Sequence, residues 1–243
     1  LSPKDQARFV ASRALLKFRR HFEGDHQNFC AWSVVDMALD ARVPALKLAF
    51  LFKPHSSVAV ELTFDQSLAS LVKSELLVRC GVLEKRALQL ACLLRWWASA
   101  RGLAGQRKGY PSGFAVCLMA VFYCQHRRML GRLLPKAREE LSAFSSAGVV
   151  EEGRLMRSVP GAMQVEAGAL TLLPGLFAFY AREFDWREDV VSVGRASRLP
   201  RHSGCPSATL SIEDPFEVGA DLAAPYLSRG RDARLRAEFR RAD

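Results

Sequence analysis

Several features that define familiar protein classes are missing from these 243 residues. No apolar run reaches the about 18 to 20 residues that a membrane-spanning helix needs, so we expect a soluble or peripheral protein. The six cysteines form no Cys-x-x-Cys pair and no His stands at metal-ligand spacing, which favours buried free thiols in a reducing compartment over a zinc site. The segment Leu1–Lys4 has neither an initiator Met nor a signal-peptide pattern, which is typical of the interior of a longer chain.

Lysine is also scarce, because the 35 basic residues comprise 27 Arg and only eight Lys. With a formal net charge of +10, the chain is expected to bind a polyanion, since basic side chains placed near phosphates release condensed counterions. RNA, DNA or an anionic membrane would satisfy this charge, and GC-rich coding would explain the Arg bias equally well. A hydrophobic content of 49% is sufficient for globular cores.

The first part of the chain predicts one helix and two neighbouring strands. An amphipathic pattern indicates a helix over Gln6–Phe22. Alternation around Pro44 predicts an edge-like strand within Ala41–Phe50, and Val58–Phe64 predicts a second strand after a polar turn.

The remainder reads as mainly helical. Only Gly81 interrupts a helical pattern that predicts helices over Ser67–Arg79 and Leu83–Arg101. A helix over Ser112–Arg128 is apolar almost all round and should be buried at the centre of a helical domain. Further on, we expect a short helix and variable loop over 134–169, a buried helix over Leu170–Phe184, a strand at Val190–Val193 and a linker over Gly194–Ser207.

Five segments in this order carry a resemblance. The first two are Ala41–Pro44 and the helix from Glu84-x-Arg86 through Leu94-Arg95-x-Trp97 to Gly102. The others are Tyr110–Met119, Leu172–Tyr180 with Phe184-Asp185 and Val190–Val193, and Ile212-Glu213-Asp214-Pro215-Phe216-Glu217. Together they are similar to the terminal uridylyltransferases and non-canonical poly(A) polymerases of the DNA polymerase β-like nucleotidyltransferase superfamily. The resemblance spans roughly residues 30–225 and implies an α+β, predominantly helical fold. It would comprise the remnant of a polymerase β-like palm sheet over 1–66 and a helical poly(A)-polymerase-type central domain over 67–227. The last segments of that domain could return to the palm, and an Arg-rich tail follows over 228–243.

In this family three carboxylates hold two divalent ions, Mg²⁺ or Mn²⁺, that activate an RNA 3′-hydroxyl and neutralise the triphosphate of UTP or ATP. Two of them belong to an Asp-x-Asp strand that would lie upstream of this chain. The resemblance places Glu61 at the third, normally an Asp, and the extra methylene would displace its oxygens. Glu61 is equally well explained as a polar residue on the solvent face of a strand.

The resemblance also implies nucleotide-binding positions. Arg95 stands where a Lys binds the triphosphate, Phe114 where a Tyr stacks on the base, and Asp214 and Glu217 where the uracil edge is read. Each has a plainer alternative: a solvated charge for Arg95, a core aromatic for Phe114, and a turn at Asp214–Phe216 that fastens the chain to the domain.

Five positions depart from the family's pattern, namely Glu61, Lys73 in place of a ribose-binding Asn, Ser99, Gly113 and Ala220. Together with the high Arg content, they favour a non-catalytic or weakly active relative that acts as an RNA-binding or assembly subunit of an intracellular ribonucleoprotein particle, without a membrane partner. The Arg richness and the scarcity of acidic residues near the start of the chain suggest the mitochondrial matrix as its compartment. The alternative is an active RNA 3′-terminal uridylyltransferase or poly(A) polymerase that uses UTP or ATP with Mg²⁺ or Mn²⁺. A third interpretation is an unrelated helical domain with chance matches. The candidate RNA-binding residues are those of the tail, whose default interpretation is a solvated, frayed helix: Arg229, Arg231, Arg234, Arg236, Arg240 and Arg241.

Overall fold

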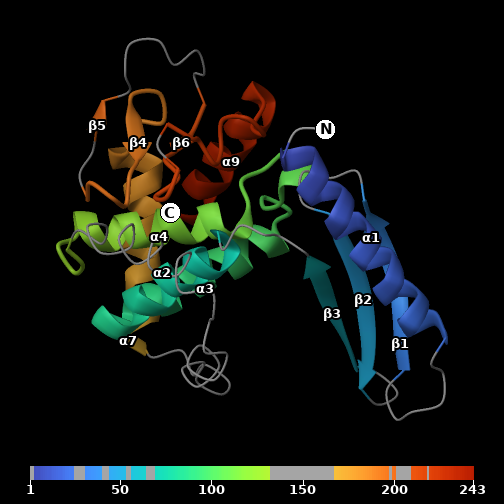
Figure 1. Ribbon diagram of the computed structural model, residues 1–243. Helices are drawn as coiled ribbons and strands as arrows, with labels where there is room; N and C mark the ends of the chain where they lie inside the picture. Colours follow the sequence, from blue (N-terminus) through green and yellow to red (C-terminus); the bar gives the residue numbers. More distant parts are fainter. Residues whose placement is uncertain are drawn as a thin grey trace. The chain divides into compact units, whose positions relative to one another are not determined.

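The computed structural model comprises two compact units, Leu1–Leu68 and Ala69–Asp243, which are described separately (Figure 1). It describes residues 3–24, 31–39, 44–52, 56–63, 69–131, 167–196, 199–200, 209–217 and 219–243.

The first unit is a three-stranded antiparallel sheet with one helix across a face. Its elements are α1 (Pro3–Gly24), β1 (Ala31–Ala38), β2 (Ala45–Phe52) and β3 (Ser56–Thr63), and the strand order is β1-β2-β3. Leu15 of α1 packs on Leu46 and Leu48 of β2, and all three are buried. Because side chains alternate along a strand, Lys47 belongs to the sheet face opposite α1.

The structure confirms the pairing of the two predicted strands but corrects the position of one of them. β2 is the central strand, paired with β1 on one side and β3 on the other, and is not an edge. Pro44 does not disturb the pairing because β2 begins at Ala45, so the proline lies outside the hydrogen-bonded ladder. Ala41–Val43 and Phe64, which the predicted strands included, lie outside the described residues.

Two helices open the second unit, α2 (Ala69–Leu83) and α3 (Lys85–Ala100). The prediction that Gly81 separates them is wrong, because Gly81 lies within α2 and α3 starts after Glu84. Glu84 caps α3, since its carboxylate accepts a hydrogen bond from the Arg86 backbone N–H. Hydrogen bonding by the Arg86 side chain lowers the pKa of Glu84 from its ordinary value. Gly81 instead permits close packing, since a Cβ there would meet Leu88 Cδ2 at 2.6 Å.

The central element is α4 (Gly113–His126), entered through a loop that contains the short helix η1 (Gln106–Lys108). Ser112 caps α4 through its hydroxyl, which accepts a hydrogen bond from the Ala115 N–H. All residues from Ala115 to Gln125 are buried, as expected for a helix that is apolar on every side. This confirms the predicted buried helix.

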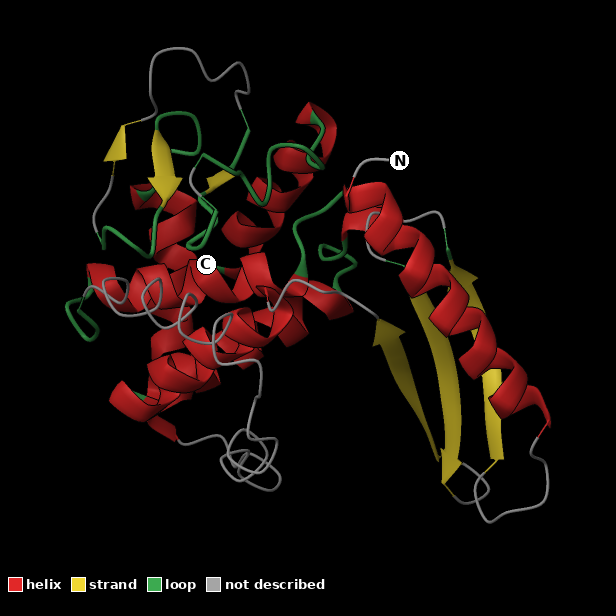
Figure 2. Ribbon diagram, viewed as in Figure 1, coloured by secondary structure: helices red, strands yellow, loops and turns green. Residues whose placement is uncertain are grey.

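A short helix, a mixed sheet and a final helix complete the unit (Figure 2). The chain forms α7 (Ala167–Leu170), α8 (Leu172–Ala178) and the π-helical turn η3 (Phe179–Glu183), which together occupy the predicted helix over Leu170–Phe184. The predicted segment 134–169 lies outside the described residues up to residue 166. In the sheet, β4 (Asp189–Val191) lies between β5 (Leu199–Pro200), which is antiparallel to it, and β6 (Ser211–Ile212), which is parallel.

The basic tail forms α9 (Arg229–Ala242), and the interpretation of it as a solvated, frayed helix is wrong. Leu235 and Phe239 are buried, and the Phe239 ring lies 5.1 Å from the Trp97 ring centroid and 5.2 Å from that of Tyr180. Buried Asp232 accepts a hydrogen bond from the Leu210 N–H. Leu235, Phe239 and the Asp232 carboxylate thus form the buried face by which this otherwise charged helix packs on the core.

The expected buried thiols are present. Cys80, Cys117 and Cys124 are free and buried, and burial raises the pKa of each thiol to about 12. Cys92 is partly buried, and Cys30 and Cys205 lie outside the described residues. In the described part of the chain no helix has the length and hydropathy needed to cross a bilayer.

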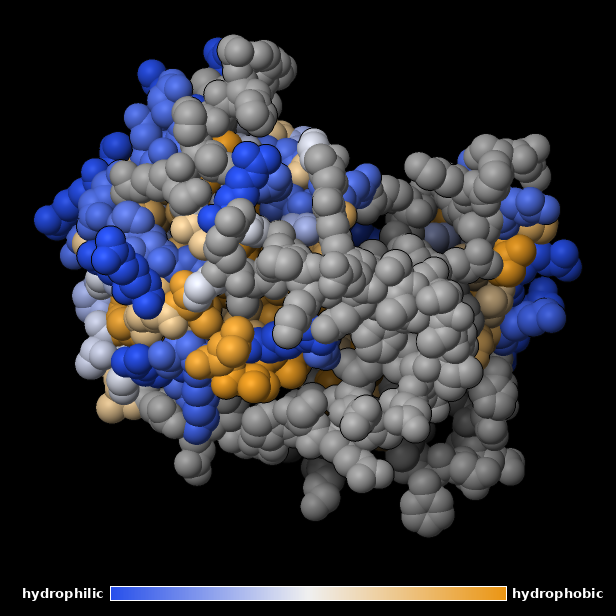
Figure 3. Space-filling model, turned by 60° about the vertical axis from the view of Figure 1, so that its left-hand side comes forward, coloured by the Kyte–Doolittle hydropathy of each residue, from blue (hydrophilic) through white to orange (hydrophobic). Residues whose placement is uncertain are grey.

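In Figure 3 the coloured part of the surface carries both hydrophilic side chains and a patch of hydrophobic ones. Among the described residues of the second unit, the large apolar side chains that are exposed are Val82, Leu83, Trp96 and Leu170. Apolar side chains at the surface of this unit are thus concentrated on α3, on α7 and at the end of α2.

Replacing Gly175 with Ala is expected to destabilise the second unit by about 1 to 3 kcal/mol, the usual cost of overpacking a core. Gly175 lies in α8, and a Cβ there would clash with the Tyr123 hydroxyl oxygen of α4. Gly230 in α9 is the matched control, because a Cβ there meets nothing within 4 Å. Gly230→Ala should be neutral or stabilising by up to about 1 kcal/mol. Thermal denaturation of both variants measures the difference, and equal melting temperatures would refute the close α4–α8 contact.

Candidate nucleotide-binding site

The segment Ile212–Leu222, here called the Asp214 loop, folds back on itself at the end of β6. The Leu222 N–H donates to the Ile212 carbonyl, and the Asp214 N–H donates to the Ala220 carbonyl. One oxygen of the Asp214 carboxylate, Oδ1, accepts hydrogen bonds from the backbone N–H groups of Phe216, at 2.9 Å, and Glu217, at 3.3 Å. Asp214 therefore holds the turn together, as the plainer interpretation of this motif predicts.

The second carboxylate oxygen of Asp214 pairs with a lysine 141 residues earlier in the chain. Lys73 of α2 places its Nζ 2.8 Å from Asp214 Oδ2. The Asp214 side chain is only 4% exposed and that of Lys73 24% exposed, so this is a largely buried ion pair. Both oxygens of Asp214 are thus engaged by groups of the chain itself.

Lys73 also approaches the aromatic ring that the resemblance assigns to base stacking. Its Nζ lies over the Phe114 ring, 5.4 Å from the centroid, which is within the range of a cation–π contact. Phe114 is partly buried and belongs to the first turn of α4. Lys73 therefore contacts both Phe114 and Asp214, two of the positions that the resemblance assigns to nucleotide binding.

Arg95 reaches the same end of α4 from α3. A Cβ at Gly113 would meet Arg95 Nε at 2.9 Å, so the Arg95 side chain crosses the backbone of Gly113. The absence of a side chain at Gly113, one of the departures from the family's pattern, leaves room for this contact. Arg95 remains exposed, as a phosphate-binding cation must be.

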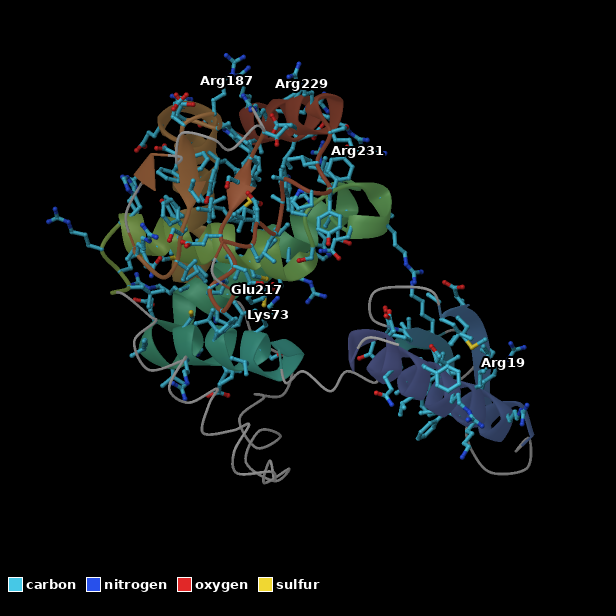
Figure 4. All side chains as sticks on the ribbon, turned by 45° about the horizontal axis from the view of Figure 1, so that its top comes forward. Arg19, Lys73, Arg187, Glu217, Arg229 and Arg231 are labelled. Atoms are coloured by element: carbon cyan, nitrogen blue, oxygen red, sulfur yellow. The ribbon has the colours of Figure 1, made fainter. Side chains whose placement is uncertain are left out.

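Glu217 is exposed on the same loop as Asp214 (Figure 4). Its own N–H is tied to the Asp214 carboxylate, which fixes the start of its side chain near Lys73. Four of the predicted positions, Arg95, Phe114, Asp214 and Glu217, therefore belong to elements that meet around the N-terminus of α4.

Glu61, the candidate third carboxylate, lies in the first unit. It is exposed on β3 and stands directly opposite Lys47 of β2, on the sheet face that α1 does not cover. A cation at the opposite position of an antiparallel pair is a suitable neighbour for a surface glutamate. Among the described residues no group of three or more His, Cys, Asp or Glu side chains could hold a metal ion. Glu61 and its described neighbours therefore do not fit a two-metal centre by themselves.

The arginines of α9 have different surroundings. Arg236 is partly buried, forms an ion pair with Asp232 and lies over the Trp186 ring. Arg241 forms an ion pair with Glu238. The other four, Arg229, Arg231, Arg234 and Arg240, are exposed.

The sequence of this chain is similar to those of known poly(A) RNA polymerases and terminal uridylyltransferases. Residues 171–219, which include the Asp214 loop up to Gly219, match the family model described as Cid1 family poly A polymerase. The poly(A) RNA polymerase GLD2 of Xenopus tropicalis is 28% identical over 212 residues, covering 84% of this chain and 38% of that protein. Terminal uridylyltransferase 1 of Leishmania tarentolae is 28% identical over 136 residues, covering 54% of this chain and 12% of that protein.

The fold is that of solved uridylyltransferases. Terminal uridylyl transferase 4 from Trypanosoma brucei with bound UPU superimposes with a TM-score of 0.74 at 19% identity, over 97% of this chain and 72% of that one. RNA editing TUTase 1 from Trypanosoma brucei, in complex with a UTP analog, gives a TM-score of 0.62 at 22% identity, over 76% of this chain and 41% of that one.

The family model and these relatives support the resemblance of the chain to the terminal uridylyltransferases and non-canonical poly(A) polymerases. Its fold is α+β and predominantly helical, as predicted. The chain spans only 38% of the length of the Xenopus tropicalis relative, or about two fifths.

The contact between Lys73 and Asp214 could not be predicted from the sequence. Lys73 stood out as a departure from a ribose-binding Asn, but the sequence contains no sign that it pairs with Asp214. The only available signals were its charge, unusual at that position, and the acidic residues of the Asp214 loop. Their contact depends on how α2 packs against that loop.

Proposed function

We propose that this chain is a non-catalytic or weakly active terminal nucleotidyltransferase relative that acts as an RNA-binding or assembly subunit of a ribonucleoprotein particle. The contact of Lys73 with Asp214 and Phe114 is the observation that carries the proposal. Lys73 already contacts two of the residues that the resemblance assigns to the nucleobase.

The chemistry of this contact opposes nucleotide binding. The Lys73 ammonium covers one face of the Phe114 ring, so a base cannot stack on that face while Lys73 stays in place. An imide N–H would need the Asp214 oxygen that Lys73 already occupies. A charge-assisted hydrogen bond contributes about 1.5 to 3 kcal/mol, so opening the site costs free energy before any nucleotide contact forms.

An active RNA 3′-terminal uridylyltransferase or poly(A) polymerase is the second candidate, favoured by the exposure of Arg95 and Glu217 beside the same site. The similar trypanosomal enzyme was solved with bound UTP and UMP and, separately, with bound ATP. In this case Arg95 would bind phosphate and Glu217 would face the base, while Lys73 would have to leave Asp214. The Asp-x-Asp carboxylates and their divalent ions would come from outside this chain.

Calorimetric titration of the chain with UTP and with ATP, in Mg²⁺ and in Mn²⁺, distinguishes the two candidates. We expect dissociation constants weaker than about 1 mM, which corresponds to a binding free energy of about −4.1 kcal/mol. The same preparation should bind single-stranded RNA with strong salt dependence. A dissociation constant for UTP in the micromolar range would overturn the proposal.

Incubating the full-length protein with labelled UTP or ATP, a divalent ion and a short RNA tests transfer directly. Little or no extension is expected, and efficient extension would favour the second candidate.

A further inference from the structure

The positive charge of α9 is divided between two flanks of the helix. The buried face is formed by Asp232, Leu235 and Phe239. Residues three or four positions apart share a side of a helix, so Arg231 and Arg234 belong to one flank and Arg229, Arg236 and Arg240 to the other. In Figure 4, Arg231 lies apart from Arg229 and Arg187.

The Arg231 and Arg234 flank is held against the loop that leads into α4. The Arg231 guanidinium lies on Gly109, where a Cβ would meet its Nη1 at 2.5 Å. Arg234 lies over the Tyr110 ring, 6.0 Å from the centroid, and donates a hydrogen bond to the Arg101 carbonyl. These packed guanidinium groups are positioned by their neighbours while their outer edges remain exposed.

Gly109 makes this contact possible for two reasons. Its φ of +75° is in the left-handed region, where glycine avoids the cost that a Cβ brings. The same missing Cβ leaves the space that the Arg231 guanidinium occupies. The loop and the helix are therefore fitted to each other at this point.

Carboxylates pair with two of the six arginines of α9, Arg236 and Arg241. Arg231 and Arg234 keep their charge, as Arg229 and Arg240 do, and differ from that second pair by packing against Gly109 and Tyr110. Asp232 pairs with Arg236, Glu238 with Arg101 and Arg241, and Asp243 with Arg182. Within the described ranges no carboxylate forms an ion pair with Arg231 or Arg234. Lys108 in η1 is exposed beside them in the loop, one residue before Gly109, and adds to the positive charge.

We propose that Arg231, Arg234 and Lys108 form a docking surface for the phosphate backbone of single-stranded RNA, here called the α9–η1 surface. Guanidinium groups fixed by packing lose little freedom when they bind phosphate in their fork geometry. The loop that carries the surface continues into Ser112 and Phe114, so RNA held there would lie at the approach to the candidate nucleotide site. This inference deepens the proposed function and rests on its RNA-binding part.

The test compares two double variants of equal charge change in the same helix, Arg231→Gln/Arg234→Gln and Arg229→Gln/Arg240→Gln. Binding of a fluorescein-labelled oligouridylate of about 15 nucleotides, near the upper site size of single-strand binding modules, is followed by anisotropy at several salt concentrations. For the first double variant the slope of log K against log salt should fall by about 1.4, since each lost phosphate contact on a single strand removes about 0.7. At 0.1 M salt this corresponds to roughly 25-fold weaker binding. The second double variant should lose less than about threefold.

Equal losses in the two double variants would overturn the α9–η1 surface and leave the proposed function intact, because the charge would then act diffusely. Failure of the unaltered chain to bind RNA would overturn both. Weakened binding to phosphatidylserine vesicles with unchanged RNA binding would also overturn the inference, in favour of a membrane surface. Lys108→Gln tests the same surface if the first double variant misfolds, because Lys108 is exposed and its replacement should not affect folding. This variant should lower the slope of log K against log salt by about 0.7.

Discussion

Replacing Lys73 with Asn is expected to lower the free energy of unfolding by about 2 to 3 kcal/mol, because it leaves a buried carboxylate without its counter-charge. Loss of one partner of a fully buried pair costs about 3 to 5 kcal/mol. We expect the smaller loss of about 2 to 3 kcal/mol because Lys73 is 24% exposed and Asp214 keeps its two backbone N–H donors. Chemical denaturation measures the change.

The same substitution should raise the affinity for UTP by at least about tenfold. When the binding-competent state is a minor population, the apparent dissociation constant exceeds the intrinsic one by the inverse of that population. An ion pair that closes the site with about 1.4 kcal/mol or more therefore hides a factor of at least about ten. Asn at position 73 removes the cation from the Phe114 ring and frees Asp214 Oδ2.

Two further variants separate the ion pair from a general effect of charge. Lys17→Asn removes the same charge from an exposed position of α1 and should alter neither stability by more than about 0.5 kcal/mol nor UTP binding. The double variant Lys73→Asn/Asp214→Asn should cost less stability than the sum of the single changes, because it leaves no unpaired charge. A fall in UTP affinity for Lys73→Asn would mean that Lys73 binds phosphate, and would favour the active candidate.

The sequence pattern alone was sufficient to predict those elements whose structure follows from their own residues and does not depend on tertiary contacts. The helix at residues 112–128 was predictable because its side chains are apolar in every direction and Ser112 is a good cap. The prediction of an edge strand that includes Pro44 was wrong, because the residues on both sides of Pro44 alternate as in a strand although β2 starts one residue later. The prediction of a helix break at Gly81 was wrong. Glycine disfavours an isolated helix, but here Leu88 packs into the space that a Cβ at residue 81 would occupy.

The candidate site shows a similar division. The resemblance assigned Arg95, Phe114, Asp214 and Glu217 to one nucleotide site, and the structure places the elements that carry them around the start of α4. The resemblance could not show that Asp214 is already satisfied, because Lys73 is 141 residues away and their contact is a product of tertiary packing. Nor could composition show that the arginines of α9 differ in their partners, since that depends on which side of the helix each occupies.

Replacing Phe239 with Ala should destabilise the second unit by about 3 to 5 kcal/mol, the range for removing a large buried aromatic side chain. Phe239 is 1% exposed, and its ring lies within 5.1 to 5.9 Å of the ring centroids of Trp97, Phe177, Tyr180 and Trp186. For a unit of 150 to 250 residues each kcal/mol lowers the melting temperature by about 2 to 4 °C, so a fall of roughly 6 to 20 °C is expected.

The adjacent residue provides the control that separates docking of α9 from helix formation alone. Arg240 is exposed, so Arg240→Ala should change stability by no more than about 0.5 kcal/mol. If the two variants melt alike, α9 does not depend on its apolar face and the frayed-helix interpretation stands again. If Phe239→Ala alone is destabilised, it should also weaken RNA binding with all arginines present, because Arg231 and Arg234 meet Gly109 and Tyr110 only while Phe239 holds the helix in place. Loss of binding without loss of charge would show that the α9–η1 surface depends on the positions of its arginines as well as on their number.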